Sequence, residues 1–229
     1  SQGTSEKALS PSPEKPLVEE SVEEENERPS LSVDLRPIQE MNKDETQTIS
    51  KKIWENESGG SVAGLTSWNG NETFGPSLGT GHFIWYYMTP KEMEESGETF
   101  YDESFPSLIL YMKQKTEVVI PSWVINGDKV VLCPWKSKKE FDDSVAGRGS
   151  KELQDKMKDL QTLMKTTIKE QKDFMITQRP ADTITEVMIK ISEYPEVSEQ
   201  IKKHVELIIS TPQGRYAFID YIQTKGKGT

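Results

Sequence analysis

The residues best suited to chemistry are concentrated between Trp54 and Tyr86. This stretch holds three of the five tryptophans and one of the two histidines, and seven glycines fall within residues 59–81. It also contains the carboxylates Glu57 and Glu72. Aromatic faces can stack on sugar rings, carboxylates can serve as acid and base, and glycines let a ligand approach the backbone closely. The composition is typical of a carbohydrate-binding cleft.

Cleavage of a glycosidic bond requires one carboxyl group that stays protonated and a second group that supports the developing positive charge. Glu57 is the candidate general acid, because Trp54 lies one helical turn before it and gives an apolar setting. Glu72 is the candidate second carboxylate, since Asn69-Gly70-Asn71 makes its loop polar. Two alternatives remain open: Glu57 could pair with Lys52, and Glu72 could be a solvated turn residue.

Seven neighbouring residues are candidates for substrate binding. Ser77 or Thr80 could hold an attacking water, and His82 could line the cleft or serve a structural role. The aromatic residues could stack on sugars or belong to the core of a small β element, which is the more usual position of such side chains. The predicted substrate-binding residues are Trp68, Asn69, Ser77, Thr80, His82, Trp85 and Tyr86.

Hydrophobic spacing predicts the elements that position these residues. A helix over 44–57 should end at Gly59-Gly60, which places Glu57 in its last turn. Two β-like runs, 62–68 and 77–87, flank an Asn-Gly hairpin signal. A helix over 105–115 should start at Ser104 as N-cap. Further on we expect a connector with a turn at 126–128, a long helix with an apolar core stripe from Leu153 to Ile168 that ends near Gln178 at Pro180, and helices over 182–192, 195–210 and 214–223.

The fold class that follows is α+β, mostly α, with a small β-hairpin element and a helical lobe. Residues 1–40 carry ten acidic and four basic side chains and five of the thirteen prolines, without an aromatic residue. Such a segment buries too little apolar surface to fold, so we expect a disordered acidic tail or tether. Residues 41–229 would then form the single domain.

Charge and composition exclude several classes of protein. A net charge of -10 argues against nucleic-acid binding, and no apolar run is long enough to be an integral membrane span. The single cysteine, Cys133, precludes an internal disulfide and is expected to be buried. With two histidines, no metal site and no cofactor are expected, and no phosphate-binding glycine loop or Gly-x-Ser-x-Gly motif is present.

Two motifs resemble the lysozyme-like superfamily. Glu57-Ser58-Gly59-Gly60 is similar to the Glu-Ser-Gly around the catalytic acid of lytic transglycosylases and goose-type lysozymes. The segment 77–82, Ser-Leu-Gly-Thr-Gly-His, resembles the Thr-Ile-Gly-x-Gly-His hairpin of phage-type lysozymes, with Ser in place of Thr. In phage-type lysozymes an acidic residue precedes this threonine at the distance that separates Asn71 from Ser77. Glu72 is one residue closer. The wider pattern is also similar to a group of secreted bacterial proteins.

The resemblance implies a lysozyme-like fold and cleavage of a β-1,4-linked amino-sugar polymer, with peptidoglycan the leading substrate and Glu57 the general acid. A lytic transglycosylase or a chitosanase-like specificity is a variant of this prediction. The alternatives are a non-catalytic glycan-binding or envelope interaction protein of the same fold, and an inhibitor or toxin-partner protein. We expect a monomer outside the cytoplasm, periplasmic or secreted, with the N-terminal tail as a tether.

Overall fold

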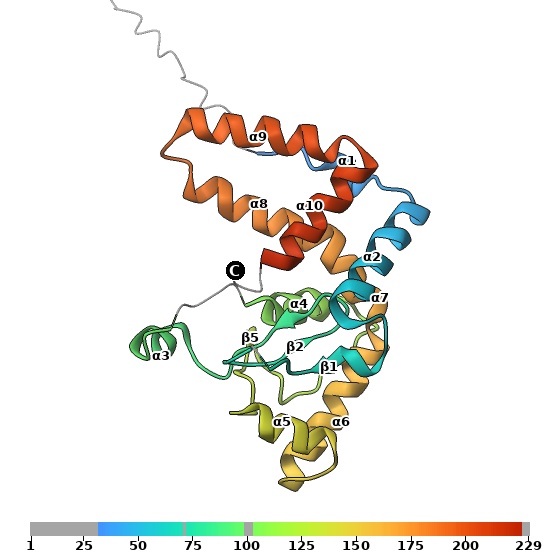
Figure 1. Ribbon diagram of the computed structural model, residues 1–229, viewed down its shortest axis with the longest axis vertical. Coiled ribbons are helices and arrows are strands. Elements are labelled where there is room, and N and C mark those ends of the chain that lie inside the picture. Colours follow the sequence, from blue (N-terminus) through green and yellow to red (C-terminus); the bar gives the residue numbers. More distant parts are fainter. Residues whose placement is uncertain (1–31, 71, 99–102, 226–229) are drawn as a thin grey trace, which may run out of the picture. The chain divides into compact units, whose positions relative to one another are not determined.

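The computed structural model describes residues 32–70, 72–98 and 103–225, and within them the fold is a mostly helical α+β arrangement with small antiparallel sheets (Figure 1). Most of the expected tail, residues 1–31, lies outside the described residues. Residues 32–40 lie within them and include the short helix α1, Arg36–Gln39. Its Ile38 is buried, and the backbone N–H of Asp34 donates to Glu206 Oε1 at 2.9 Å.

Helix α2, Lys43–Ser58, confirms the helix expected to end at the glycine pair. The Asn42 side chain accepts a hydrogen bond from the Glu45 N–H and caps its start. Gly59 adopts the left-handed conformation with φ 65°, which ends the helix at little steric cost. Glu57 therefore lies in the last turn.

A three-stranded antiparallel sheet follows, in the order β1-β2-β3, with β1 at Thr66–Ser67, β2 at Ser77–Leu78 and β3 at Phe83–Ile84. The run expected over 62–68 is only partly a strand, because Ala63–Leu65 forms the 3-10 helix η1. The run expected over 77–87 contains two strands joined by the four-residue turn 79–82. The short helix α3, Pro90–Glu95, then begins with a capping box at Thr89.

Helix α4, Ser104–Lys113, corrects the expected N-cap. Ser104 is its first residue and Glu103 occupies the cap position. The Ser104 hydroxyl oxygen instead accepts from the backbone N–H of Ile84 at 3.0 Å, so this side chain ties the helix to strand β3. The hydroxyl that the local sequence predicted to cap the helix therefore forms its hydrogen bond with strand β3 instead.

The connector contains a small hairpin, β4 at Ile125–Asn126 and β5 at Lys129–Val130, around the expected turn. Helix α5, Lys138–Val145, comes next and is capped by Ser137.

The expected single long helix is divided into segments, and Pro180 does not end it. The segments are α6 at Lys151–Thr166, α7 at Ile168–Asp173, the π-helix η2 at Phe174–Gln178 and α8 at Arg179–Lys190. Pro180 lies in the first turn of α8, where a missing N–H is tolerated, and the wider π-turn before it accommodates the ring. The apolar stripe is nonetheless core: Met157, Leu160, Leu163 and Met164 are buried.

The last two helices, α9 at Pro195–Ile209 and α10 at Pro212–Lys225, match the expected ones closely. Helix α10 contacts both α8 and α9 (Figure 1).

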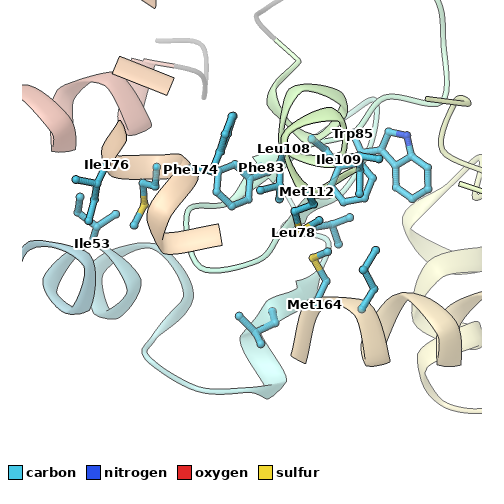
Figure 2. Close-up of a cluster of buried hydrophobic side chains, with 14 of the residues drawn as sticks. Ile53, Leu78, Phe83, Trp85, Leu108, Ile109, Met112, Met164, Phe174 and Ile176 are labelled. Atoms are coloured by element: carbon cyan, nitrogen blue, oxygen red, sulfur yellow. The ribbon is translucent and has the colours of Figure 1, made fainter. Parts of the chain in front are cut away.

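The π-helix η2 lies in the hydrophobic core, where it contacts α1, α2, α4, α8 and α10. Figure 2 shows Phe174 of η2 beside Phe83 of β3, and the two rings lie edge to face at 5.6 Å. In the same view Ile176 approaches Ile53 of α2. Among the described residues, no helix combines the length and apolarity needed to cross a membrane.

Candidate active site

The structure brings together the two residues that the motifs singled out, Glu57 and His82. Glu57 Oε2 lies 3.6 Å from His82 Nδ1, although the two residues belong to different elements. Both side chains are almost enclosed, with 6% exposure for Glu57 and 9% for His82. Lys52, the alternative partner for Glu57, lies over the ring of Tyr216 instead. The end of α2 therefore supplies the carboxyl, and the hairpin turn supplies the imidazole, of one enclosed pair.

Hydrogen bonds fix the turn 79–82 against α2 and the 3-10 helix η1. The hydroxyl of Ser58, which follows the candidate acid directly, donates to the Gly79 carbonyl at 2.7 Å. The Gly79 N–H donates to the Leu65 carbonyl at 2.8 Å. His82 has φ 48°, a left-handed conformation that is unusual for a residue with a side chain and is found in turns and at functional sites. This backbone conformation sets the direction of the imidazole.

A buried glutamine, Gln171, holds the other side of the turn. Its Oε1 accepts from the backbone N–H of Thr80 at 2.9 Å. Its Nε2 donates to the Met164 carbonyl at 2.7 Å and to the Thr167 hydroxyl at 3.0 Å. Sequence reasoning missed Gln171, because it is 91 positions from its partner and belongs to no local motif.

Two further residues near this site, Lys172 and Gln223, were also not anticipated. Lys172 Nζ lies 4.8 Å from the centre of the Trp54 ring, and burial lowers the pKa of this lysine. A Cβ atom on Gly81 would lie 3.0 Å from Gln223 Oε1, which places the last helix against the turn. Within the described residues, the buried polar atoms Trp54 Nε1, Thr80 Oγ1 and Gln223 Nε2 have no hydrogen-bond partner. The turn therefore has unused donors and acceptors close by.

Glu72 lies in the loop before β2 and is engaged by its own loop. Its carboxylate accepts from the hydroxyl of Ser77 in a short hydrogen bond and from the backbone N–H of Asn69 at 3.0 Å. The Asn69 side-chain amide also donates to it at 3.3 Å. The Glu72 carbonyl accepts from Trp68 Nε1 at 2.6 Å. Asn71, which stands at the position of the acidic residue in the phage-type lysozyme motif, lies outside the described residues.

The three predicted stacking residues are core side chains. Trp85 has no exposed surface and stacks on Phe105 with ring centroids 4.5 Å apart. Trp68 packs edge-on against Phe141, and Tyr86 is buried in a smaller cluster. The structure favours the core interpretation of all three, because the rings are already packed against protein and offer no face to a sugar.

Within the described ranges, no group of three or more His, Cys, Asp or Glu side chains is arranged to hold a metal ion. Comparisons with models of protein families, with curated proteins and with solved structures found no match for this chain.

Proposed function

We propose that this chain is a glycoside-cleaving enzyme of lysozyme-like fold that acts on a β-1,4-linked amino-sugar polymer, with peptidoglycan the leading substrate. Glu57 is its general acid. The observation that carries the proposal is the enclosed carboxyl of Glu57, at the end of a helix, 3.6 Å from His82 in the turn of a glycine-rich hairpin. The resemblance of both motifs to lysozyme-like enzymes supports it independently.

The surroundings of Glu57 suit a proton donor. A general acid must hold its proton in a setting poor in water and release it to the leaving oxygen as the glycosidic bond breaks. The helix end fixes the backbone of Glu57, and the hydrogen bond from Ser58 to Gly79 fixes the turn opposite it. His82 then restrains the position of the carboxyl. In this proposal His82 is a positioning residue.

The second carboxylate has a different role. The Glu72 carboxylate accepts hydrogen bonds from Ser77 and Asn69, which fix its position in the loop. A fixed negative charge in the hairpin region would stabilise an oxocarbenium-like transition state. This role requires a polar loop, whereas the general acid Glu57 requires an enclosed, apolar setting.

The direct test compares Glu57→Gln with Glu55→Gln on purified peptidoglycan. Both changes remove one carboxylate from the same helix, but Glu55 is an exposed residue paired with Lys51. We expect Glu57→Gln to lower the rate by about 100-fold to 10,000-fold, the contribution of a positioned acid, and Glu55→Gln to leave it unchanged. Full lytic activity in Glu57→Gln would refute the proposal.

The chemistry of the new chain ends separates the variants of this proposal. Reducing ends indicate hydrolysis, whereas anhydro ends indicate a lytic transglycosylase, which needs no second carboxylate. A Glu72→Gln variant that loses activity favours the hydrolase. Chitosan as an alternative substrate tests the chitosanase-like specificity.

One observation favours a second candidate function, a non-catalytic glycan-binding or envelope interaction protein. The hydrogen bonds to the Glu72 carboxylate come from its own loop, as expected for a structural turn residue. Oligosaccharide binding with no product after long incubation of the wild-type protein would favour this candidate.

A further inference from the structure

A groove of about 630 Å³ lies apart from the candidate active site, between the connector and helices α6 and α7. Neither Glu57 nor His82 lines it. Its volume is in the range of small-molecule binding sites. It is lined by Glu117, Val118, Val119, Pro121, Ser122, Trp123, Asp159, Thr162, Leu163, Thr166, Thr167 and Glu170.

The groove contains a buried carboxylate with no partner in the described protein. Glu170 is only 8% exposed, and within the described residues its side chain makes no hydrogen bond or ion pair. A largely buried carboxylate is stabilised when a ligand supplies a counter-charge or hydrogen-bond donors. Glu117 and Asp159 add two further carboxylates to the same lining, while no lysine or arginine of the described chain lines it.

The indole and threonine donors of the lining are already used inside the protein. Trp123 Nε1 donates to Asp159 Oδ2 at 3.0 Å. The hydroxyls of Thr162, Thr166 and Thr167 each donate to the carbonyl one turn earlier, at 2.7 to 2.9 Å. The threonine hydroxyl oxygens and the carboxylates can therefore only accept hydrogen bonds from a ligand. The groove therefore offers acceptors and negative charge to a ligand that brings donors and positive charge.

The remaining lining is apolar. Val118, Val119, Pro121 and Leu163 supply hydrocarbon surface beside the carboxylates, and Val119 is largely exposed. Lys156 Nζ lies 5.7 Å from the Trp123 ring of the groove, but it is held by Glu152 at 2.6 Å. That ion pair does not involve Glu170.

We propose that this groove binds a small ligand that carries a protonated amine on an apolar or sugar body, with Glu170 as the counter-ion of the amine. The ammonium donates to Glu170 and to threonine oxygens, and the body of the ligand packs on the valine and proline side. This inference does not rest on the glycosidase proposal, because neither Glu57 nor His82 lines the groove. The two regions are connected through Thr167, whose hydroxyl accepts from Gln171.

The test uses two pairs of probes at constant ionic strength and neutral pH. Hexylamine and hexanol share an alkyl body, and glucosamine and N-acetylglucosamine share a sugar body, but only the first of each pair is charged. Binding is followed by NMR titration of the full chain, with the indole signal of Trp123 as reporter. We expect each amine to bind at least tenfold more tightly than its neutral counterpart, and the better amine identifies the ligand body.

Variants locate the charge. Glu170→Gln keeps the shape of the side chain, and Glu186→Gln removes an exposed carboxylate from α8 as the matched control. We expect Glu170→Gln to weaken amine binding at least tenfold, with hexanol binding and the Tm of the free protein not lowered. Glu186→Gln should bind as the wild type does. Three results would overturn the proposal: neutral probes bind as well as amines, Glu170→Gln binds amines normally, or Glu170→Gln unfolds at a lower temperature and so reveals a structural role.

Discussion

Glu57 and Glu72 show how the surroundings of a carboxylate determine what it can do. Glu57 is enclosed beside an imidazole at the junction of α2 and the hairpin turn. Glu72 is surrounded by donors from its own loop. The two carboxylates therefore differ in their partners, and the proposed function gives them different roles, general acid for Glu57 and electrostatic stabiliser for Glu72.

Gly75 is a position where a single methyl group should disturb the sheet. A Cβ atom there would lie 1.8 Å from the backbone carbonyl oxygen of Trp85, so the chain would have to move. We expect Gly75→Ala to lower the free energy of unfolding by about 3 kcal/mol, the upper range for overpacking. Gly70→Ala is the control, because nothing lies within 4 Å of its added Cβ. Urea denaturation of both variants checks the prediction, and equal midpoints would contradict it.

Cys133 gives the protein a specific sensitivity to alkali. Burial raises the pKa of its thiol from 9.0 to about 12. The folded state therefore disfavours the thiolate, while the unfolded chain forms it above about pH 9. The neutral thiol contributes its full share of the free energy of unfolding below that pH. This contribution is lost as the pH rises toward 12, and the total loss is at most about 4 kcal/mol.

A Cys133→Ala variant isolates this effect. The stability advantage of the wild type over Cys133→Ala should narrow as the pH rises from about 8 to about 11, because only the wild type has this thiol to ionise on unfolding. Chemical denaturation at each pH measures the difference. If the difference in the free energy of unfolding stays constant over this range, burial does not raise the pKa of the Cys133 thiol.

Among the elements, α7 supports the hairpin through one side chain. Replacing Gln171 by Ala leaves the Thr80 N–H and the Met164 carbonyl without their side-chain partner. Each buried group left unsatisfied costs about 1 to 3 kcal/mol. We expect Gln171→Ala to speed hydrogen exchange at the Thr80 amide and to lower activity, because the turn that carries the imidazole loosens.

Gln178→Ala, at the end of the adjoining η2, is the matched control for Gln171→Ala, since Gln178 is exposed and its side chain donates to Asp182 on the surface of α8. It should leave exchange in the hairpin turn unchanged. If the Thr80 amide exchanges at the same rate in both variants, Gln171 does not support the turn.

Sequence patterns predicted the elements whose ends are local. The end of α2 at Gly59 depends on a glycine at the position where left-handed backbone is needed, and neighbouring residues suffice to specify that. Ser104 and Pro180 were predicted wrongly because distant or unusual structure intervenes. The hydroxyl of Ser104 serves a strand 20 positions away, and Pro180 follows a π-turn that no spacing rule anticipates.

The same distinction holds for the candidate site. Glu57 and His82 were predictable, because each belongs to a short motif with its own glycines. Gln171, Lys172 and Gln223 were not, because they come from helices more than 80 positions beyond the hairpin and carry no local signal. Tertiary packing alone brings them to the turn.

At the scale of the whole molecule, charge is unevenly distributed along the chain. Residues 1–40 carry ten acidic and four basic side chains, or -6 of the total -10, and the remaining 189 residues carry -4. The acidity of the chain therefore says little about the substrate of the hairpin region. The carboxylates of the groove beside α7 are a local feature within a nearly balanced domain.

A crystal structure of Glu57→Gln with a β-1,4-linked amino-sugar oligomer would show whether Glu57 is placed to donate a proton to a glycosidic oxygen, as proposed. We expect one glycosidic oxygen within about 3 Å of the amide that replaces the Glu57 carboxyl, the distance needed for proton transfer from the native acid. An oligomer bound with every glycosidic oxygen remote from that amide would contradict it.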